Sequence, residues 1–118
     1  MRDHRSLLAW QEANAVVRAV MGGTRTKRHP CVEQLQRAAL SVQLNISEGY
    51  AFSSRKRFRN HLQIAYASAV EAADLLELSG QLELISRDST AAMLARCRQS
   101  QRLIRGLLRS GRLREASS

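Results

Sequence analysis

The chain has 118 residues, of which 44% are hydrophobic and 4% are aromatic, with one Pro and six Gly. This composition excludes a disordered chain, and the length suits one domain whose core needs no disulfide or metal. The formal net charge is +9, from nineteen Lys and Arg, nearly all of them Arg, against ten Asp and Glu. Such a charge attracts polyanions, above all nucleic acids, although a chain that uses Arg for every surface cation would look the same.

No run of about 18 apolar residues is present, and the first residues are too polar for a secretory signal. We therefore expect a cytoplasmic protein without a membrane span. Cys31 and Cys97 are far apart in the sequence and lack close-spaced partners. This pattern favours two reduced thiols over a disulfide between them.

The abundance of Ala, Leu, Arg, Gln and Glu favours helices over strands. A first helix is predicted over about 3–21, with Asp3 as its cap and Gly22-Gly23 as its stop. A second is predicted over about 31–49, where Pro30 is tolerated in the first turn and Gly49 ends the helix. Their apolar stripes are Trp10, Ala13, Val17 and Val20 in the first, and Val32, Leu35, Ala38, Ala39, Val42 and Ile46 in the second.

A third helix is predicted over about 54–79, capped by Ser53 or Ser54 and ended by Gly80. A fourth is predicted over about 87–110, with Ser86 as its cap and an acidic first turn at Asp88. Their apolar stripes are Phe58, Leu62, Ala65, Ala69, Ala72 and Leu76 in the third, and Leu94, Cys97, Ile104 and Leu108 in the fourth. Four amphipathic helices with short links and no strand signal predict an all-α, antiparallel up-and-down four-helix bundle in a single domain over residues 1–118.

Charge is unevenly distributed along the chain. Residues 71–88 hold five acids and one Arg, whereas two other segments are strongly basic. Arginines at spacings of four, three, four and three line one edge of the fourth helix, where their mutual repulsion calls for a partner charge. The alternative is an ordinary solvated helix face. The candidate phosphate contacts are Arg55, Lys56, Arg57 and Arg59 in the turn into the third helix, and Arg98, Arg102, Arg105, Arg109 and Arg112 in the fourth.

The second helix carries apolar residues on two sides, in place of one apolar and one polar face. Leu40 and Leu44 point nearly opposite to its core stripe, which suggests that a neighbouring subunit covers this helix a second time. A polar line borders that side, and its residues are Arg37, Ser41, Asn45 and Glu48. We expect this line to mark an assembly border, where Arg37 and Glu48 could pair. The alternative is that the line is only the solvated edge of the helix.

The run RAALSVQLNISEGY resembles the hallmark of the bacterial four-helix bundle proteins encoded in 23S ribosomal RNA intervening sequences, R-A-x-x-S-[IV]-x-x-N-I-x-E-G. RDHRSLLAWQEA, HLQIAYASAVEAADLL and GQLELIS are also similar to that family, so the resemblance covers nearly the whole chain. It departs at Gln43, where the family usually has a Pro that kinks the second helix, and in a shorter segment between Pro30 and Arg37.

The resemblance implies an up-and-down bundle that assembles as a homopentameric ring with a basic surface. It also implies kinship with the accessory protein of diversity-generating retroelements, which binds a reverse transcriptase and nucleic acid. The motif positions, expected to serve structure and assembly together with Leu40 and Leu44, are Arg37, Ser41, Asn45, Glu48, Gly49 and Glu71.

No catalytic motif accompanies these features. His4, His29 and His61 lie at three different helix starts, and His29 with Cys31 supplies only two possible metal ligands. Glu48 and Glu71 could face each other across two helices, but the Glu-x-x-His motif of di-iron bundles is absent. We therefore expect no enzyme activity, no cofactor and no metal.

Two functions remain open. The first is a homo-oligomer that binds structured RNA or DNA through phosphate contacts, with binding that weakens steeply as salt rises. The second is an adaptor that docks a partner protein, such as a reverse transcriptase, without contacting nucleic acid directly. Tyr50, Phe52 and Tyr66 are the plausible stacking aromatics, and their small number favours duplex or structured RNA over single strands.

Overall fold

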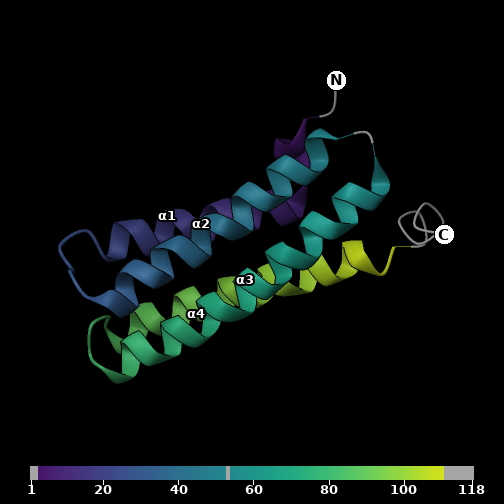
Figure 1. The fold of residues 1–118 in the computed structure, drawn as a ribbon. Coiled ribbons are helices and arrows are strands. Elements are labelled where there is room, and N and C mark those ends of the chain that lie inside the picture. Colours follow the sequence, from purple (N-terminus) through teal and green to yellow (C-terminus); the bar gives the residue numbers. More distant parts are fainter. Residues whose placement is uncertain (1–2, 53, 111–118) are drawn as a thin grey trace.

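The computed structural model describes residues 3–52 and 54–110. Over these residues the chain forms a short 3₁₀ turn, η1 (His4–Ser6), and four helices, α1 (Leu8–Gly23), α2 (Pro30–Ala51), α3 (Arg55–Gln81) and α4 (Arg87–Leu108), without a strand. The helices run antiparallel in a rod of 46 × 23 × 21 Å (Figure 1). Both α1 and α3 pack against α2 and α4. The predicted all-α four-helix bundle is confirmed.

The start of the first helix differs from the prediction. The Asp3 carboxylate accepts a hydrogen bond from the Arg5 amide at 3.0 Å, so it caps η1 and not α1. Leu7 is extended, and α1 begins only at Leu8. Gly22 and Gly23, which were predicted to stop the helix, instead form its last turn. Glycine can adopt helical backbone angles as well as others, so it does not by itself fix where a helix ends.

The later helix starts agree with their predicted caps. Ser54 accepts from the Arg57 amide at the start of α3, and Ser86 accepts from the Ser89 amide at the start of α4. The N-cap of α2 is His29, whose Nδ1 accepts from the Cys31 amide at 3.1 Å. These bonds satisfy amide groups that a helix start leaves without an intrahelical partner.

Helix α3 ends one residue beyond Gly80, through a left-handed residue at Glu83, whose φ is 62°. The Leu84 amide donates to the Ser79 carbonyl at 2.9 Å, and the Glu83 amide donates to the Gly80 carbonyl at 3.0 Å. This pair of bonds is a Schellman motif, so the chain reverses direction after α3 with its last carbonyls satisfied.

The core follows the predicted stripes of α2 and α3, all of whose members are buried. On α1 the buried line is rotated slightly from the predicted one: Val16 is buried, whereas Trp10 and Val17 are half-buried. The Trp10 indole donates to the Ser47 hydroxyl at 2.9 Å, so this ring lies on the border with α2 and not in the core. No helix of the described residues is long and apolar enough to cross a membrane.

Candidate nucleic-acid interface

The two basic segments of the sequence meet at one end of the rod. The start of α3 and the end of α4 both lie at the end that holds the α2–α3 connection (Figure 1). The Arg59 guanidinium donates to the Leu108 carbonyl at 2.7 Å and so bonds the first segment to the second. A cation at a helix C-terminus also offsets the negative end of the helix dipole. We call this surface the basic end, and its residues are Arg55, Lys56, Arg57, Arg59, Arg105 and Arg109.

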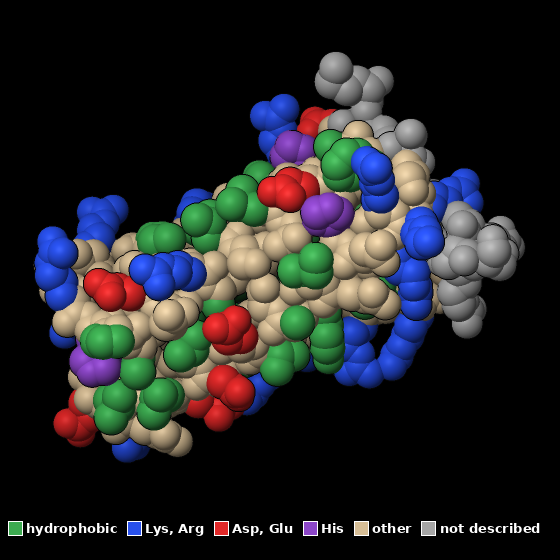
Figure 2. Space-filling model, viewed as in Figure 1, with side chains coloured by type: hydrophobic (Ala, Val, Ile, Leu, Met, Phe, Trp, Pro, Cys, Tyr) green, Lys and Arg blue, Asp and Glu red, His purple; other side chains and the backbone are tan. Residues whose placement is uncertain are grey.

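The cations of the basic end differ in their exposure and in whether their side chains already interact with other groups of the chain. Lys56, Arg105 and Arg109 are exposed, and none of them forms a side-chain hydrogen bond or ion pair within the described part of the chain. Arg57 lies over the Phe52 ring at 4.8 Å, while Arg59 is half-buried and bonded to Leu108. Figure 2 shows several Lys and Arg side chains gathered at this end.

The rest of the predicted arginine edge is occupied by local partners. Arg98 forms an ion pair with Glu77 at 3.1 Å, and Arg102 donates twice to Gln99 at 2.7 and 3.0 Å. Arg112 lies outside the described residues. The basic edge of α4 is thus partly offset by the acidic stretch of α3, and its uncompensated part is the half nearest the basic end.

The polar line of α2 forms a chain of hydrogen bonds to α3. The Ser41 and Ser68 hydroxyls are 2.8 Å apart, and the Asn45 amide nitrogen donates to the Ser41 carbonyl at 2.9 Å. His61 Nδ1 lies 3.0 Å from the Asn45 amide oxygen. Because that oxygen can only accept, His61 carries a proton on Nδ1 and donates it. Ser41 and Asn45 are therefore part of a seam between two helices of one chain, whereas Arg37 and Glu48 at the two ends of the line are exposed.

Two pairings that the sequence suggested along this line are not made within the chain. Arg37 and Glu48 lie roughly 16 Å apart along α2 at about 1.5 Å per residue, so they do not pair inside one subunit. Glu48 instead lies 4.0 Å from His61 Nδ1. Glu71 follows His61 on α3 by roughly 15 Å, so Glu48 and Glu71 do not face each other. The antiparallel register leaves no carboxylate pair for acid–base chemistry there.

The outer side of α2 exposes apolar side chains, as its pattern predicted. Leu40 is 38% exposed and Leu44 is 44% exposed, and Ile64 on α3 is 50% exposed. In Figure 2 hydrophobic side chains lie along the visible face of α2 and α3, between scattered acidic ones. This face gives the single chain an apolar surface that a second subunit could cover.

The surroundings of His61 were not predicted from the sequence. The Phe52 ring stacks on the imidazole with centroids 6.0 Å apart and planes at 26°. Gly49 provides the space, since a Cβ there would lie 2.6 Å from the His61 Cβ. The sequence did show that Gly49, Phe52 and His61 flank the short connection between α2 and α3. Only the packing of α2 on α3 brings them into contact.

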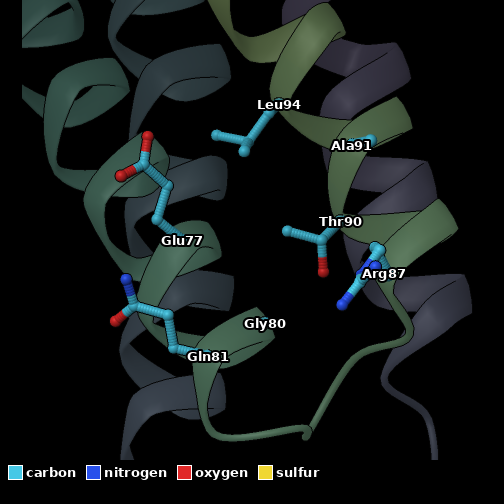
Figure 3. Close-up of a pocket in the computed structure, with 7 residues that line it drawn as sticks. All are labelled: Glu77, Gly80, Gln81, Arg87, Thr90, Ala91 and Leu94. Carbon is cyan, nitrogen blue, oxygen red and sulfur yellow. The ribbon is translucent and has the colours of Figure 1, made fainter.

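A shallow pocket of about 440 Å³ lies between the end of α3 and the start of α4 (Figure 3). Two of its polar side chains are already engaged, since Glu77 pairs with Arg98 and the Thr90 hydroxyl donates to the Ser86 carbonyl. Its other polar side chains are Gln81 and Arg87. Within the described residues no three His, Cys, Asp or Glu side chains cluster to hold a metal ion. The pocket therefore offers no nucleophile with an adjacent base.

The two cysteines are free thiols in different surroundings. Cys97 is buried, and its thiol donates to the Ala69 carbonyl at 3.2 Å. Burial raises the pKa of Cys97 to about 11, because the thiolate would lose its hydration. Cys97 therefore acts as a small core side chain and not as a nucleophile.

The geometry defines an all-α, antiparallel four-helix bundle that carries the basic end beside the α2–α3 connection and an exposed apolar face on α2 and α3. Residues 5–106 match the family model described as 23S rRNA-intervening sequence protein, and the chain belongs to that family. The fold is also similar to a crystal structure from Bacteroides thetaiotaomicron, a protein of unknown function from the S23 ribosomal protein family. That similarity has a TM-score of 0.74 at 24% identity, over 86% of this chain and 95% of the other. No match was found among curated proteins.

Proposed function

We propose that this chain is a non-enzymatic, cytoplasmic bundle that assembles with copies of itself and binds structured nucleic acid at its basic end. The observation that carries this proposal is the bond between Arg59 and Leu108. It holds together two basic segments that are far apart in the sequence, so that Lys56, Arg105 and Arg109 present their charges on one surface.

The chemistry of these side chains favours phosphate as the ligand. Guanidinium groups offer planar pairs of N–H donors that match phosphate oxygens, and they remain charged at any physiological pH. Side chains on helix ends and edges reach the nucleic-acid backbone before the bases, so binding would depend little on base sequence.

The exposed apolar face supports the proposed self-association. Leu40 and Leu44 lie on the side of α2 opposite its core stripe, and a water-exposed apolar surface of this kind is stabilised when a second subunit covers it. The resemblance described above suggests a pentamer. In such a ring, each subunit would add one more basic end to a shared binding surface.

The experiment is a titration of a labelled, structured RNA followed by fluorescence anisotropy, at about 50 and 200 mM salt. The double variant Arg105→Ala with Arg109→Ala should weaken binding and lower the slope of log affinity against log salt by about 2, at about 0.9 per lost phosphate contact. Arg25→Ala with Arg28→Ala removes the same charge from exposed positions in the α1–α2 connection and should change the slope much less.

Absence of binding by the unmodified protein at low salt would overturn the proposal. It would favour the alternative, an adaptor that docks a partner protein such as a reverse transcriptase without touching nucleic acid. Equal losses in the two double variants would show that net charge matters and that the basic end does not.

A further inference from the structure

An apolar groove of about 350 Å³ lies where the start of α1 meets the end of α4, at the same end of the rod as the basic end (Figure 1). Four leucines line it, and these are Leu7, Leu8, Leu103 and Leu107. The other lining residues, among them Gly106, are small. Because covering apolar surface removes it from water, such a groove favours a ligand with an apolar body.

The groove is open to a ligand, and its walls are already in place. Leu8 is 66% exposed, and a Cβ at Gly106 would meet nothing within 4 Å, so the space beside this glycine is free. Leu7, Leu103 and Leu107 are half-buried and pack against the hydrophobic core. Because these walls are ordered in the free chain, they lose little additional conformational entropy when a ligand binds.

Two cations on α4 border the groove. Arg102 and Arg109 lie about one helical turn before and after Gly106, so the three residues lie on the same side of the helix. Both arginines are exposed, and Arg109 forms no side-chain hydrogen bond or ion pair within the described part of the chain. Arg102 donates two N–H groups to Gln99, and the other N–H groups of its guanidinium remain free to donate.

The acids at the start of the chain do not neutralise these two arginines. Glu12, the acid of α1, pairs with Arg96 at 3.4 Å, and Asp3 pairs with Arg5 at 3.2 Å. The groove therefore offers apolar walls beside two positive charges that are not paired with an acid of the described residues. This combination complements a ligand that has an apolar body and a negative head group.

We infer that this groove binds a single-chain anionic amphiphile, of which a medium-chain fatty acid is the simplest. Its alkyl chain lies along the leucines, and its carboxylate accepts hydrogen bonds from Arg102 or Arg109. The limited volume of the groove suits one short chain, whereas a membrane surface would need a much broader apolar area. The inference does not depend on the proposed function, although the ligand shares Arg109 with the basic end.

The test is isothermal titration calorimetry of the unmodified protein with decanoate, decyltrimethylammonium and acetate at near-physiological salt. The first two probes share an alkyl chain and differ in the charge of the head group, whereas acetate has the head group alone. Decanoate should bind at least about tenfold more tightly than decyltrimethylammonium, which is the smallest effect expected of one hydrogen bond between charged groups. Acetate should show no measurable binding.

Gly106→Leu fills the groove from its floor. Because a Cβ there meets nothing within 4 Å and leucine favours a helix more than glycine does, this variant should fold, which circular dichroism checks. Its affinity for decanoate should fall at least about tenfold. Gly22→Leu is the matched control, since Gly22 is also a helical glycine with open space and lies at the opposite end of α1. This control should leave the affinity unchanged.

Arg102→Gln with Arg109→Gln removes the two charges and keeps the leucines. This double variant should bind decanoate about as weakly as the unmodified protein binds decyltrimethylammonium. Its affinity for decyltrimethylammonium should not fall, because that probe gains nothing from a positive charge beside the groove.

Four results would overturn the inference. Undiminished binding of decanoate by Gly106→Leu would show that the ligand lies elsewhere. Equal affinities of the unmodified protein for decanoate and decyltrimethylammonium would show that the arginines do not select an anion. The third result is no binding of decanoate at about millimolar concentration. The fourth is binding to vesicles that contain phosphatidylglycerol without binding of decanoate, which would indicate a membrane surface in place of a single chain.

Discussion

Gly49 shows how one missing side chain sets the distance between two helices. A Cβ at this position would lie 2.6 Å from the His61 Cβ and 3.1 Å from the Phe58 Cδ1. The His61 Cβ is fixed to the α3 backbone, so the clash cannot be relieved by rotating a flexible side chain. The glycine of the NISEGY run is therefore a packing residue between α2 and α3, in the interior of a helix that extends to Ala51.

We predict that Gly49→Ala lowers the free energy of unfolding by about 1–3 kcal/mol, because overpacking forces α2 and α3 apart. The measurement is urea denaturation followed by circular dichroism. Gly22→Ala is the matched control, since a Cβ there meets nothing within 4 Å and alanine favours the helix by about 0.5–1 kcal/mol. Equal effects of the two substitutions would contradict the packing role.

At the scale of elements, the end of α4 depends on a side chain from α3. Arg59 reaches the Leu108 carbonyl across the basic end, and the bond is half-buried. A helix C-terminus leaves carbonyl groups without intrahelical partners, and a charged donor satisfies one of them. The same residue that the sequence pattern assigned to phosphate binding thus has a structural task in the free chain.

We predict that Arg59→Met, which keeps much of the alkyl stem and loses the donor, destabilises the fold by about 1–2 kcal/mol. Amide hydrogen exchange should speed up mainly in the last turn of α4. Lys56→Met removes an exposed cation from the same turn of α3 and should leave the exchange of α4 unchanged. Unaltered exchange in Arg59→Met would show that the bond to Leu108 contributes nothing to the end of this helix.

At the scale of the whole molecule, the four helices bury a hydrophobic core between them, while the outer side of α2 keeps apolar side chains exposed to water. The buried residues form two clusters inside the four helices, whereas Leu40 and Leu44 lie outside both. Scattered exposed leucines are common on monomers, so their contribution has to be measured in the assembly.

We predict that the unmodified protein has a solution mass of several subunits and that Leu40→Glu with Leu44→Glu reduces it to one. Light scattering measures the mass, and circular dichroism checks that the helices persist. Leu8→Glu changes a leucine that is even more exposed, at the start of α1, and should leave the mass unchanged. A monomeric unmodified protein at all concentrations would refute this self-association surface.

Periodicity alone determined the four helices and the complete buried stripes of α2 and α3, because apolar residues spaced by three and four fall on one face of a helix. Ser54 and Ser86 were also predictable as caps, since capping is local chemistry within one turn. The NISEGY run and its flanks were enough to indicate the family. The position of Leu40 and Leu44 outside the core followed from the same periodicity.

One local feature was not foreseen from the sequence. Asp3 caps η1 and α1 starts later than predicted, because an Asp side chain can cap either kind of turn.

The tertiary packing decided which distant residues come into contact. The register of one helix against its neighbour determines two sets of contacts, that of Arg59 with Leu108 and that of His61 with Asn45 and Phe52. Helical spacing places a residue on a face but contains no information on its register against a neighbouring helix. For that reason the basic end and the stacking of Phe52 on His61 emerged only from the tertiary structure.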